Sequence, residues 1–175
     1  MTRSLSFFAK LQRILRHRWL DERDAHRAVP PELAKRLQSY VHASESRHSG
    51  QIRICVEASL PLSYLWRNAS SHQRAVTLFG KLRVWDTEHN NGVLIYLLLA
   101  ERRIELVADR GLNHKVTQAE WQQILDGLGG ALKAGRIEEG LTQALAEVST
   151  LMVAHFPHVA GEIDPNELSD ELMIQ

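Results

Sequence analysis

The stretch from Val93 to Leu99 constrains the fold of this chain more than any other. It is a continuous apolar run, bounded on one side by Asn90, Asn91 and Gly92, that is too short to cross a bilayer and shorter than a typical helix. After a polar break at 100–102, residues 103–108 alternate between apolar and charged side chains. The pattern predicts a central strand buried on both faces, joined by a tight turn to an antiparallel partner.

The segments before this hairpin predict a parallel partner for the central strand. Residues 51–58 alternate as a strand does, and Ser70 or Ser71 can cap a following helix. That helix has apolar residues at core spacing: Ala75, Val76, Phe79 and Leu82. A strand, a helix and a second strand form a right-handed βαβ unit, so strands 51–58 and 92–99 are expected to be parallel. The connection between strand and helix contains Leu62, Leu65 and Trp66, which we expect to cover the sheet edge.

Three further helices are indicated by periodicity and end signals. The first begins at Pro31 and has a stripe expected to be buried: Leu33, Leu37, Tyr40 and Val41. The second follows a capping box at Thr117 and Glu120, and the third follows Gly135. The predicted fold class is α/β, an α/β/α sandwich on a short mixed sheet, with an added N-terminal amphipathic helix.

Length and composition place these elements in one domain with two appendages. With 175 residues, we expect a basic helical segment at 1–29, an α/β domain at 30–157 and an acidic tail at 158–175, which is mobile or loosely docked. The formal charge of zero gives no reason to expect nucleic acid as a partner. A single cysteine, Cys55, in a strand pattern excludes an intramolecular disulfide framework. Basic residues interrupt any signal-peptide core, so we expect a cytoplasmic protein.

The two ends of the chain carry opposite charge. Residues 1–20 contain five basic residues and no acid, and residues 161–175 contain five acids and no base. Within 4–20, apolar residues recur at helical spacing opposite the basic ones. Two interpretations remain open for this amphipathic helix. Its apolar stripe packs on the domain, or it contacts an anionic membrane surface or an acidic partner, with the tail 161–175 held against its basic face.

Established catalytic motifs are absent from the sequence. It contains no His-Glu-x-x-His, Gly-x-Ser-x-Gly, P-loop, dinucleotide fingerprint or paired-cysteine metal pattern. What remains is an acidic and amide group around the hairpin, with Asp86, Glu88 and Asn91 before the central strand and Asp109 after its partner. The start of one antiparallel strand lies beside the end of the other. We therefore consider a calcium or magnesium site of these four residues, with ordinary turn chemistry as the alternative.

Several segments, in order, resemble the TPM domain family, which includes thylakoid-lumen phosphatase-like proteins, photosystem repair proteins and receptor modulators. They are Asp86–Tyr96, Arg103–Val107 with Gly111-Leu112, and Ala134-Gly135-Arg136 before Glu138–Leu141. The resemblance covers about residues 45–155. It implies an α/β/α sandwich and, in some members, calcium binding or a weak acid phosphatase activity.

The chain departs from the family pattern at acidic positions. The family often has Asp where this chain has Asn90, Gly-Tyr-Gly-Leu-Glu where it has Asp109–Asn113, and an acid where it has Gln118. The chain lacks the family's carboxylates at these positions, and Asp109 can restore one. We therefore expect a non-catalytic binding or accessory module with a protein partner, in membrane-associated maintenance. The alternative is a weak metal-assisted phosphomonoesterase with Asp109 as ligand or nucleophile.

Overall fold

Four strands form one mixed sheet in the computed structural model, which describes residues 7–158 and 172–175. The strands are β1 (Ile52–Glu57), β2 (Val93–Leu98), β3 (Arg103–Ala108) and β4 (Met173–Ile174), in the order β3-β2-β1-β4. β1 and β2 are parallel with Ile52 beside Val93, and β2 and β3 are antiparallel with Val93 beside Ala108. Both predicted pairings are confirmed. Every residue of β2 is buried, as expected of a strand with neighbours on both sides and helices on both faces.

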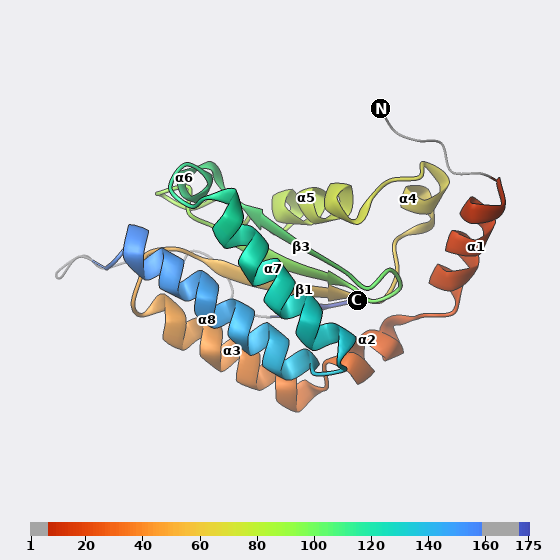
Figure 1. Ribbon diagram of the computed structural model, residues 1–175, viewed down its shortest axis with the longest axis horizontal. Coiled ribbons are helices and arrows are strands. Elements are labelled where there is room, and N and C mark those ends of the chain that lie inside the picture. Colours follow the sequence, from red (N-terminus) through yellow and green to blue (C-terminus); the bar gives the residue numbers. More distant parts are fainter. Residues whose placement is uncertain (1–6, 159–171) are drawn as a thin grey trace.

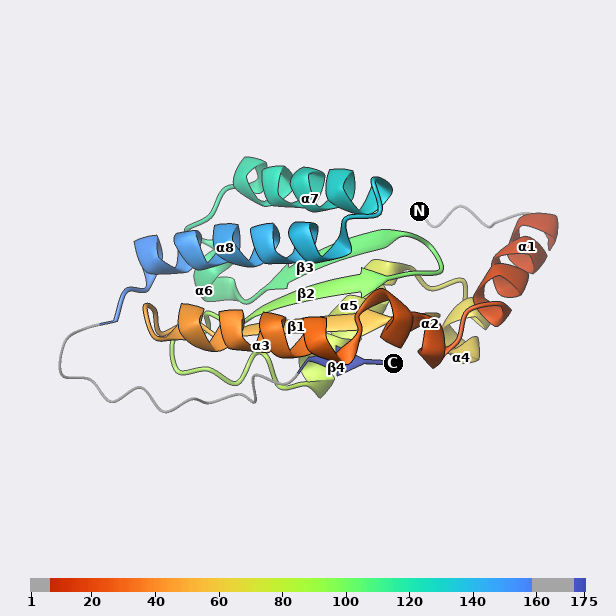
Figure 2. The same cartoon turned by 90° about the horizontal axis from the view of Figure 1, so that it is seen from below.

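Helices cover both faces of the sheet, so the predicted α/β/α sandwich is confirmed (Figures 1 and 2). One face is covered by α2 (Glu22–Ala28), α3 (Pro31–Glu45), α7 (Gln118–Lys133) and α8 (Ile137–His155). The other is covered by α4 (Leu62–Trp66) and α5 (Ser71–Lys81). A single turn, α6 (Arg110–Asn113), follows β3, and α1 (Phe7–Arg18) lies beside α4 at one end of the molecule (Figure 1).

Local end signals in the sequence fix several helix boundaries. Ser70 caps α5, and Thr117 caps α7 through a reciprocal pair with Glu120. Each arrangement satisfies backbone donors that the first turn of a helix leaves free. After α7 the chain turns at Gly135, whose φ of 74° is in the left-handed region that glycine adopts without strain.

Four side chains that were predicted to face the core or the sheet are exposed. For two of them the reason is that the buried stripes of α3 and α5 are narrower than the periodicity suggests. Tyr40 on α3 and Val76 on α5 are exposed, and the core-facing residue of α5 beside Ala75 is Leu78. Of the three side chains predicted to cover the sheet edge before α5, only Leu65 is buried. Its neighbours Leu62 and Trp66 are exposed on α4 and do not cover the sheet edge.

The end of the chain is part of the sheet, contrary to the expectation of a loosely docked tail. β4 pairs parallel with β1, placing Met173 beside Cys55 and Ile174 beside Val56. Met173 packs into the core on the α5 face and Ile174 into the core on the α3 and α8 face. The acidic stretch 161–171 and its predicted contact with the basic helix lie outside the described residues. The predicted 1–29 segment is also partly integrated, since Ala25 and Val29 are fully buried in the main core.

Candidate functional site

Two of the four predicted ligands, Asp86 and Glu88, lie on the exposed loop between α5 and β2. The carboxylate of Asp86 forms an ion pair with Arg83, three residues earlier. Asp86 therefore has a partner within its own loop and is not directed to a shared centre by any described contact.

The other two, Asn91 and Asp109, lie near each other at the end of the hairpin, where Asp109 pairs with the residue after Asn91. The amide of Asp109 donates to the carbonyl of Gly92, with 2.9 Å between nitrogen and oxygen. Asn91 is fully buried and donates from Nδ2 to Ser49 Oγ at 3.2 Å. Asp109 Oδ1 accepts from the amide of Arg110 at 2.7 Å and caps the turn that follows. Hydrogen bonds within the turn and the loop thus use part of the hydrogen-bonding capacity of each side chain.

The alternation of the strands directs these two side chains apart. Residues two apart lie on the same face of a sheet. By this alternation Asn91 shares the face of Val93, which packs in the core under α3 and α8, and Asp109 shares the face of Val107, which packs on the α5 side. The backbone proximity predicted from the sequence is present. The hydrogen bonds of the two side chains do not join them in a common ligand centre.

One observation nevertheless suits a hard cation. Asp109 Oδ2 and Asn91 Oδ1 are buried and accept no hydrogen bond. Carboxylate and amide oxygens are the donors that calcium and magnesium take. Over the described ranges 7–158 and 172–175, however, no group of three or more His, Cys, Asp or Glu side chains could hold a metal ion. The residues present thus offer isolated oxygen donors, and the metal assignment stays a prediction.

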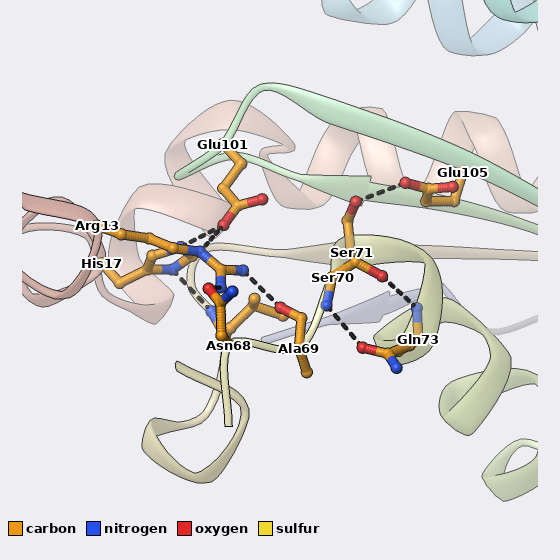
Figure 3. A network of polar contacts seen from close by, with 10 residues as sticks. Arg13, His17, Asn68, Ala69, Ser70, Ser71, Gln73, Glu101 and Glu105 are labelled. Atoms are coloured by element: carbon orange, nitrogen blue, oxygen red, sulfur yellow. Dashed lines mark hydrogen bonds and ion pairs between the residues drawn. The ribbon is translucent and has the colours of Figure 1, made fainter. Parts of the chain in front are cut away.

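A polar network attaches α1 to the rest of the molecule (Figure 3). Arg13 donates to Glu101 Oε1 at 2.6 Å, to Asn68 Oδ1 at 3.2 Å and to the carbonyl of Ala69 at 2.7 Å. His17 is buried, with its Nε2 3.1 Å from Glu101 Oε1 and its Nδ1 accepting from the amide of Leu60 at 3.0 Å. Because Nδ1 is an acceptor, Nε2 carries the proton when the ring is neutral.

Glu101, in the turn between β2 and β3, is the acceptor that both α1 side chains share. Burial opposes its ionisation, but the hydrogen bonds from His17 and Arg13 outweigh burial and lower the pKa of Glu101 below its ordinary value. The ionised form is therefore the one that holds α1. A second anchor, Lys10, donates to the carbonyl of Trp66 at 2.8 Å, with its ammonium 5.2 Å from the centre of the indole ring.

This attachment leaves the apolar stripe of α1 facing solvent. Among the α1 side chains from residue 8 onward, only Ile14 packs against the core on the α5 side, and it is half-buried. The exposed fractions of the other large apolar side chains range from 44% to 84%: Phe8, Leu11, Leu15 and Trp19. The neighbouring helix α4 adds Leu62 and Trp66, exposed by 62% and 72%. We call these six side chains the α1–α4 apolar surface. The stripe did not pack on the domain as the simpler interpretation of the sequence expected.

A buried polar cluster lies under α5 and has a structural role. Glu57 on β1 accepts two hydrogen bonds from Arg74 Nε and one from Arg74 Nη2, the shortest at 2.6 Å. Tyr96 and Gln175 also donate to this carboxylate, at 2.6 and 3.2 Å. Burial, followed by the charge of Glu57, raises the pKa of Tyr96, so its hydroxyl stays a donor. The cluster satisfies a buried charge and connects β1, β2, α5 and the chain end.

Two other groups with potential chemistry are inert. Burial raises the pKa of Cys55 to about 12, so it remains a thiol, as expected of a cysteine in a core strand. Burial also lowers the pKa of His48 to about 4, against a smaller opposing effect from its hydrogen bond to the Gly50 carbonyl. Neither group is poised for catalysis near neutral pH.

Sequence reasoning missed the residues that orient α1. The sequence pattern places Glu101 in a polar turn and Arg13 on the basic face of an amphipathic helix, and it gives His17 no role. The available signal was a lone acid in a tight turn opposite a helix without acids, which does not by itself specify a contact across 88 positions.

Comparison with known proteins identifies the family and the fold. Among curated proteins, none matches this chain. Two of the solved structures that are similar to this chain were determined in solution. One is the BA42 protein of the psychrophilic bacterium Bizionia argentinensis, with 23% identity, a TM-score of 0.72, and coverage of 83% of this chain and 94% of that one. The other is the N-terminal domain of a protein from P. gingivalis, with 19% identity, a TM-score of 0.60, and coverage of 74% and 81%.

At these identities the two structures establish the fold alone, which agrees with the sandwich described above. None of the described helices has the length and apolar character needed to span a membrane. The family model of the TPM domain matches residues 23–151, which are 129 of the 175 residues and include the sheet strands β1 to β3 and helices α3 to α7. The chain therefore belongs to the TPM domain family.

Proposed function

We propose that this chain is a non-catalytic TPM module that attaches to an anionic membrane surface through the α1–α4 apolar surface. The observation that carries the proposal is the orientation of α1. Its polar residues Arg13 and His17 bind the domain, so its apolar stripe is presented to the surroundings in a fixed position. Contiguous exposed apolar surface of this kind is characteristic of interaction sites.

Charge favours a lipid surface as the occupant. Arg16 and Arg18 are exposed beside the stripe, and residues 1–20 contain no acid to oppose an anionic headgroup. Basic residues next to Trp, Phe and Leu are what interfacial helices use. Trp19 and Trp66 are the side-chain type that is enriched at membrane interfaces.

Position also suits a planar surface. α1 and α4 lie together at one end of the molecule, beyond the end of the sheet (Figures 1 and 2). The stripe is on a projecting helix, so it can contact a plane while the body of the domain stays in water. This geometry supports a peripheral attachment with the apolar residues at the headgroup and acyl boundary.

The test is flotation of the full chain with vesicles of phosphatidylcholine alone and with phosphatidylglycerol added. We expect binding that increases with the anionic fraction and decreases with salt. Replacing Leu11 and Leu15 together by Ala should weaken partition about tenfold or more, because apolar area is lost from the interface. Trp19→Ala should weaken it too, whereas the control Trp85→Ala, at an exposed tryptophan after α5, should leave it unchanged.

The proposal fails if the chain does not bind anionic vesicles at low salt. It also fails if the Leu11 and Leu15 double variant floats as the wild type does. Equal losses for Trp19→Ala and Trp85→Ala would indicate a nonspecific effect and would count against the α1–α4 surface as well.

A cation at Asp109 is a second candidate, supported by its buried and unpartnered Oδ2. If calcium or magnesium binds there, millimolar metal should raise the melting temperature, and Asp109→Asn should abolish the increase. Asp126→Asn, at an exposed acid on α7, is the control and should preserve it. Hydrolysis of p-nitrophenyl phosphate that requires both metal and Asp109 would favour the phosphatase alternative over a non-catalytic module. An unchanged melting temperature in metal would leave turn chemistry as the role of Asp109.

A further inference from the structure

An apolar cavity lies between the β2–β3 hairpin and the turn from α7 to α8. Its volume is about 490 Å³. The apolar lining comes from the last part of β2, the start of β3 and the facing ends of the two helices: Leu97, Leu99, Ile104, Leu132 and Ile137. Gly129 of α7 also lines the cavity and contributes no side chain to it. Such a volume is within the range of about 300 to 1,000 Å³ that small-molecule sites occupy.

Two cations at the rim give this cavity a polar end. Arg102 and Lys133 both line it and both are exposed. Within residues 7–158 and 172–175, neither side chain makes a hydrogen bond or an ion pair. Arg102 is held at a φ of 50° in the hairpin turn, which fixes where its side chain leaves the backbone.

The acids near these cations along the chain already have other partners. Glu101, next to Arg102, is bound to Arg13 and His17. Glu105 is bound to Ser71 and His72. Glu138 is bound to Arg36 through two hydrogen bonds of 2.8 and 2.9 Å, and Glu139 is bound to Arg136 at 2.6 Å. The rim therefore combines uncompensated positive charge with an apolar interior. A neutral apolar ligand would leave that charge unused, and a fully polar anion would leave the apolar wall exposed.

We propose that this cavity binds a single-chain anionic amphiphile, with the acyl chain against the apolar wall and the anionic head at Arg102 and Lys133. The shared chemistry is a carboxylate or phosphate on a hydrocarbon chain, as in a fatty acid or an alkyl phosphate. The site is separate from the α1–α4 apolar surface and from Asp109, and it does not depend on either.

Adjacent glycines on α7 provide a matched test of the cavity. A Cβ on Gly129 would be 3.9 Å from Ile104 Cδ1, so the backbone accepts a side chain, and Gly129→Leu would extend that side chain into the cavity. A Cβ on Gly130 would meet nothing within 4 Å, and this residue is exposed. Both changes place Leu for Gly in the same helix, so only the position relative to the cavity differs.

Titration of decanoate below its micelle concentration, followed by calorimetry, measures the effect. We expect the wild type and Gly130→Leu to bind with the same dissociation constant, and Gly129→Leu to bind at least tenfold more weakly. The melting temperatures of both variants without ligand verify that each is folded. Equal binding by Gly129→Leu and the wild type, or no decanoate binding by the wild type, would overturn the proposal.

The head group is tested by changing the ligand and the rim. Decanol should bind more weakly than decanoate, and decyl phosphate should show whether a phosphate head is preferred. Lys133→Gln and Arg102→Gly should each lower the affinity for decanoate about fivefold, which corresponds to the loss of an exposed ion pair of about 1 kcal/mol. Glycine is chosen at position 102 because it adopts the positive φ there without strain. Arg103→Gln is the control next in sequence and should bind as the wild type does. If decanol binds as tightly as decanoate, the cavity is an apolar site without anion recognition and the assignment is wrong.

Discussion

Helices α1 and α3 are both amphipathic, yet they face the domain with opposite sides. α3 buries its apolar residues Leu33, Leu37 and Val41 and exposes Lys35 and Arg36. α1 directs Arg13 and His17 toward the domain and exposes its apolar stripe. An amphipathic pattern therefore shows that a helix has two faces, and it does not show which face packs.

The surface opposite each helix decides the outcome. α3 lies over β1, whose Ile52, Ile54 and Val56 offer an apolar surface, so apolar burial determines its orientation. α1 lies over the hairpin turn and the segment between α4 and α5, where the Glu101 carboxylate and the Ala69 carbonyl need donors. Unsatisfied polar groups are costly when buried, so the basic side of α1 packs there.

The largest difference between the two helices should appear on truncating a core residue of α3. Leu37→Ala removes a fully buried side chain, and we expect it to lower the free energy of unfolding by about 2 to 5 kcal/mol. Urea denaturation followed by circular dichroism measures the change. A loss below about 1 kcal/mol would show that α3 does not depend on its apolar stripe, and the contrast with α1 would disappear.

Acidification should destabilise the α3 side of the molecule next most strongly, through His48. Its pKa is about 4 in the folded protein against 6.5 when unperturbed, so the unfolded chain binds more protons between these values. Stability is then complete above about pH 6.5 and decreases as the pH falls toward 4, on the order of 2 kcal/mol by pH 5. Above pH 6.5, the melting temperatures of the wild type and His48→Gln should depend on pH in the same way. Below pH 6.5, the melting temperature of the wild type should decrease more steeply than that of the variant. An identical pH dependence would exclude His48 as the cause.

Removing the anchor of α1 should have a smaller and local effect. Glu101→Ala leaves Arg13 and His17 without their shared acceptor, and we expect the attachment of α1 to weaken by about 1 to 2 kcal/mol. Hydrogen exchange should become faster in residues 7–18 and remain unchanged in α3. The exposed pair of Arg36 and Glu138 gives a control, since Glu138→Ala should not change exchange in α1. Slow exchange retained in α1 would mean that its other contacts suffice.

The smallest effect is expected for the apolar stripe of α1 itself. Leu15→Ala should change the free energy of unfolding by less than about 0.5 kcal/mol, because Leu15 is 52% exposed and packs on no core cluster. The same urea titration used for Leu37→Ala measures it. A loss comparable to that of Leu37→Ala would show that the stripe is part of the folded core after all and would remove the basis of the membrane proposal.

The sequence identified several residues of the candidate site but did not predict how their side chains are directed. The amides and acids at the hairpin end were identified, and strand pairing brought Asn91 and Asp109 near each other in the backbone. The directions of their side chains depend on the exact strand register and on the turn at Asp109, because a shift of one residue moves a side chain to the other face of the sheet. Register and turn are in part set by the packing of surrounding residues. The cavity beside Gly129 had no sequence signal, because a glycine in a helix does not indicate what faces it.

The sequence by itself determined strands β1 to β3 of the sheet and the helical layers on its two faces. A buried apolar run, an alternating neighbour and capping signals such as Ser70 and Thr117 are local features, and their consequences act over a few residues. The tertiary structure alone decided three matters: the outward stripe of α1, the insertion of Met173 and Ile174 beside β1, and the carboxylate of Glu57 as the centre of a buried cluster. Each depends on contacts between residues far apart in the chain, where the free energy of burying one group is set by the partner that meets it.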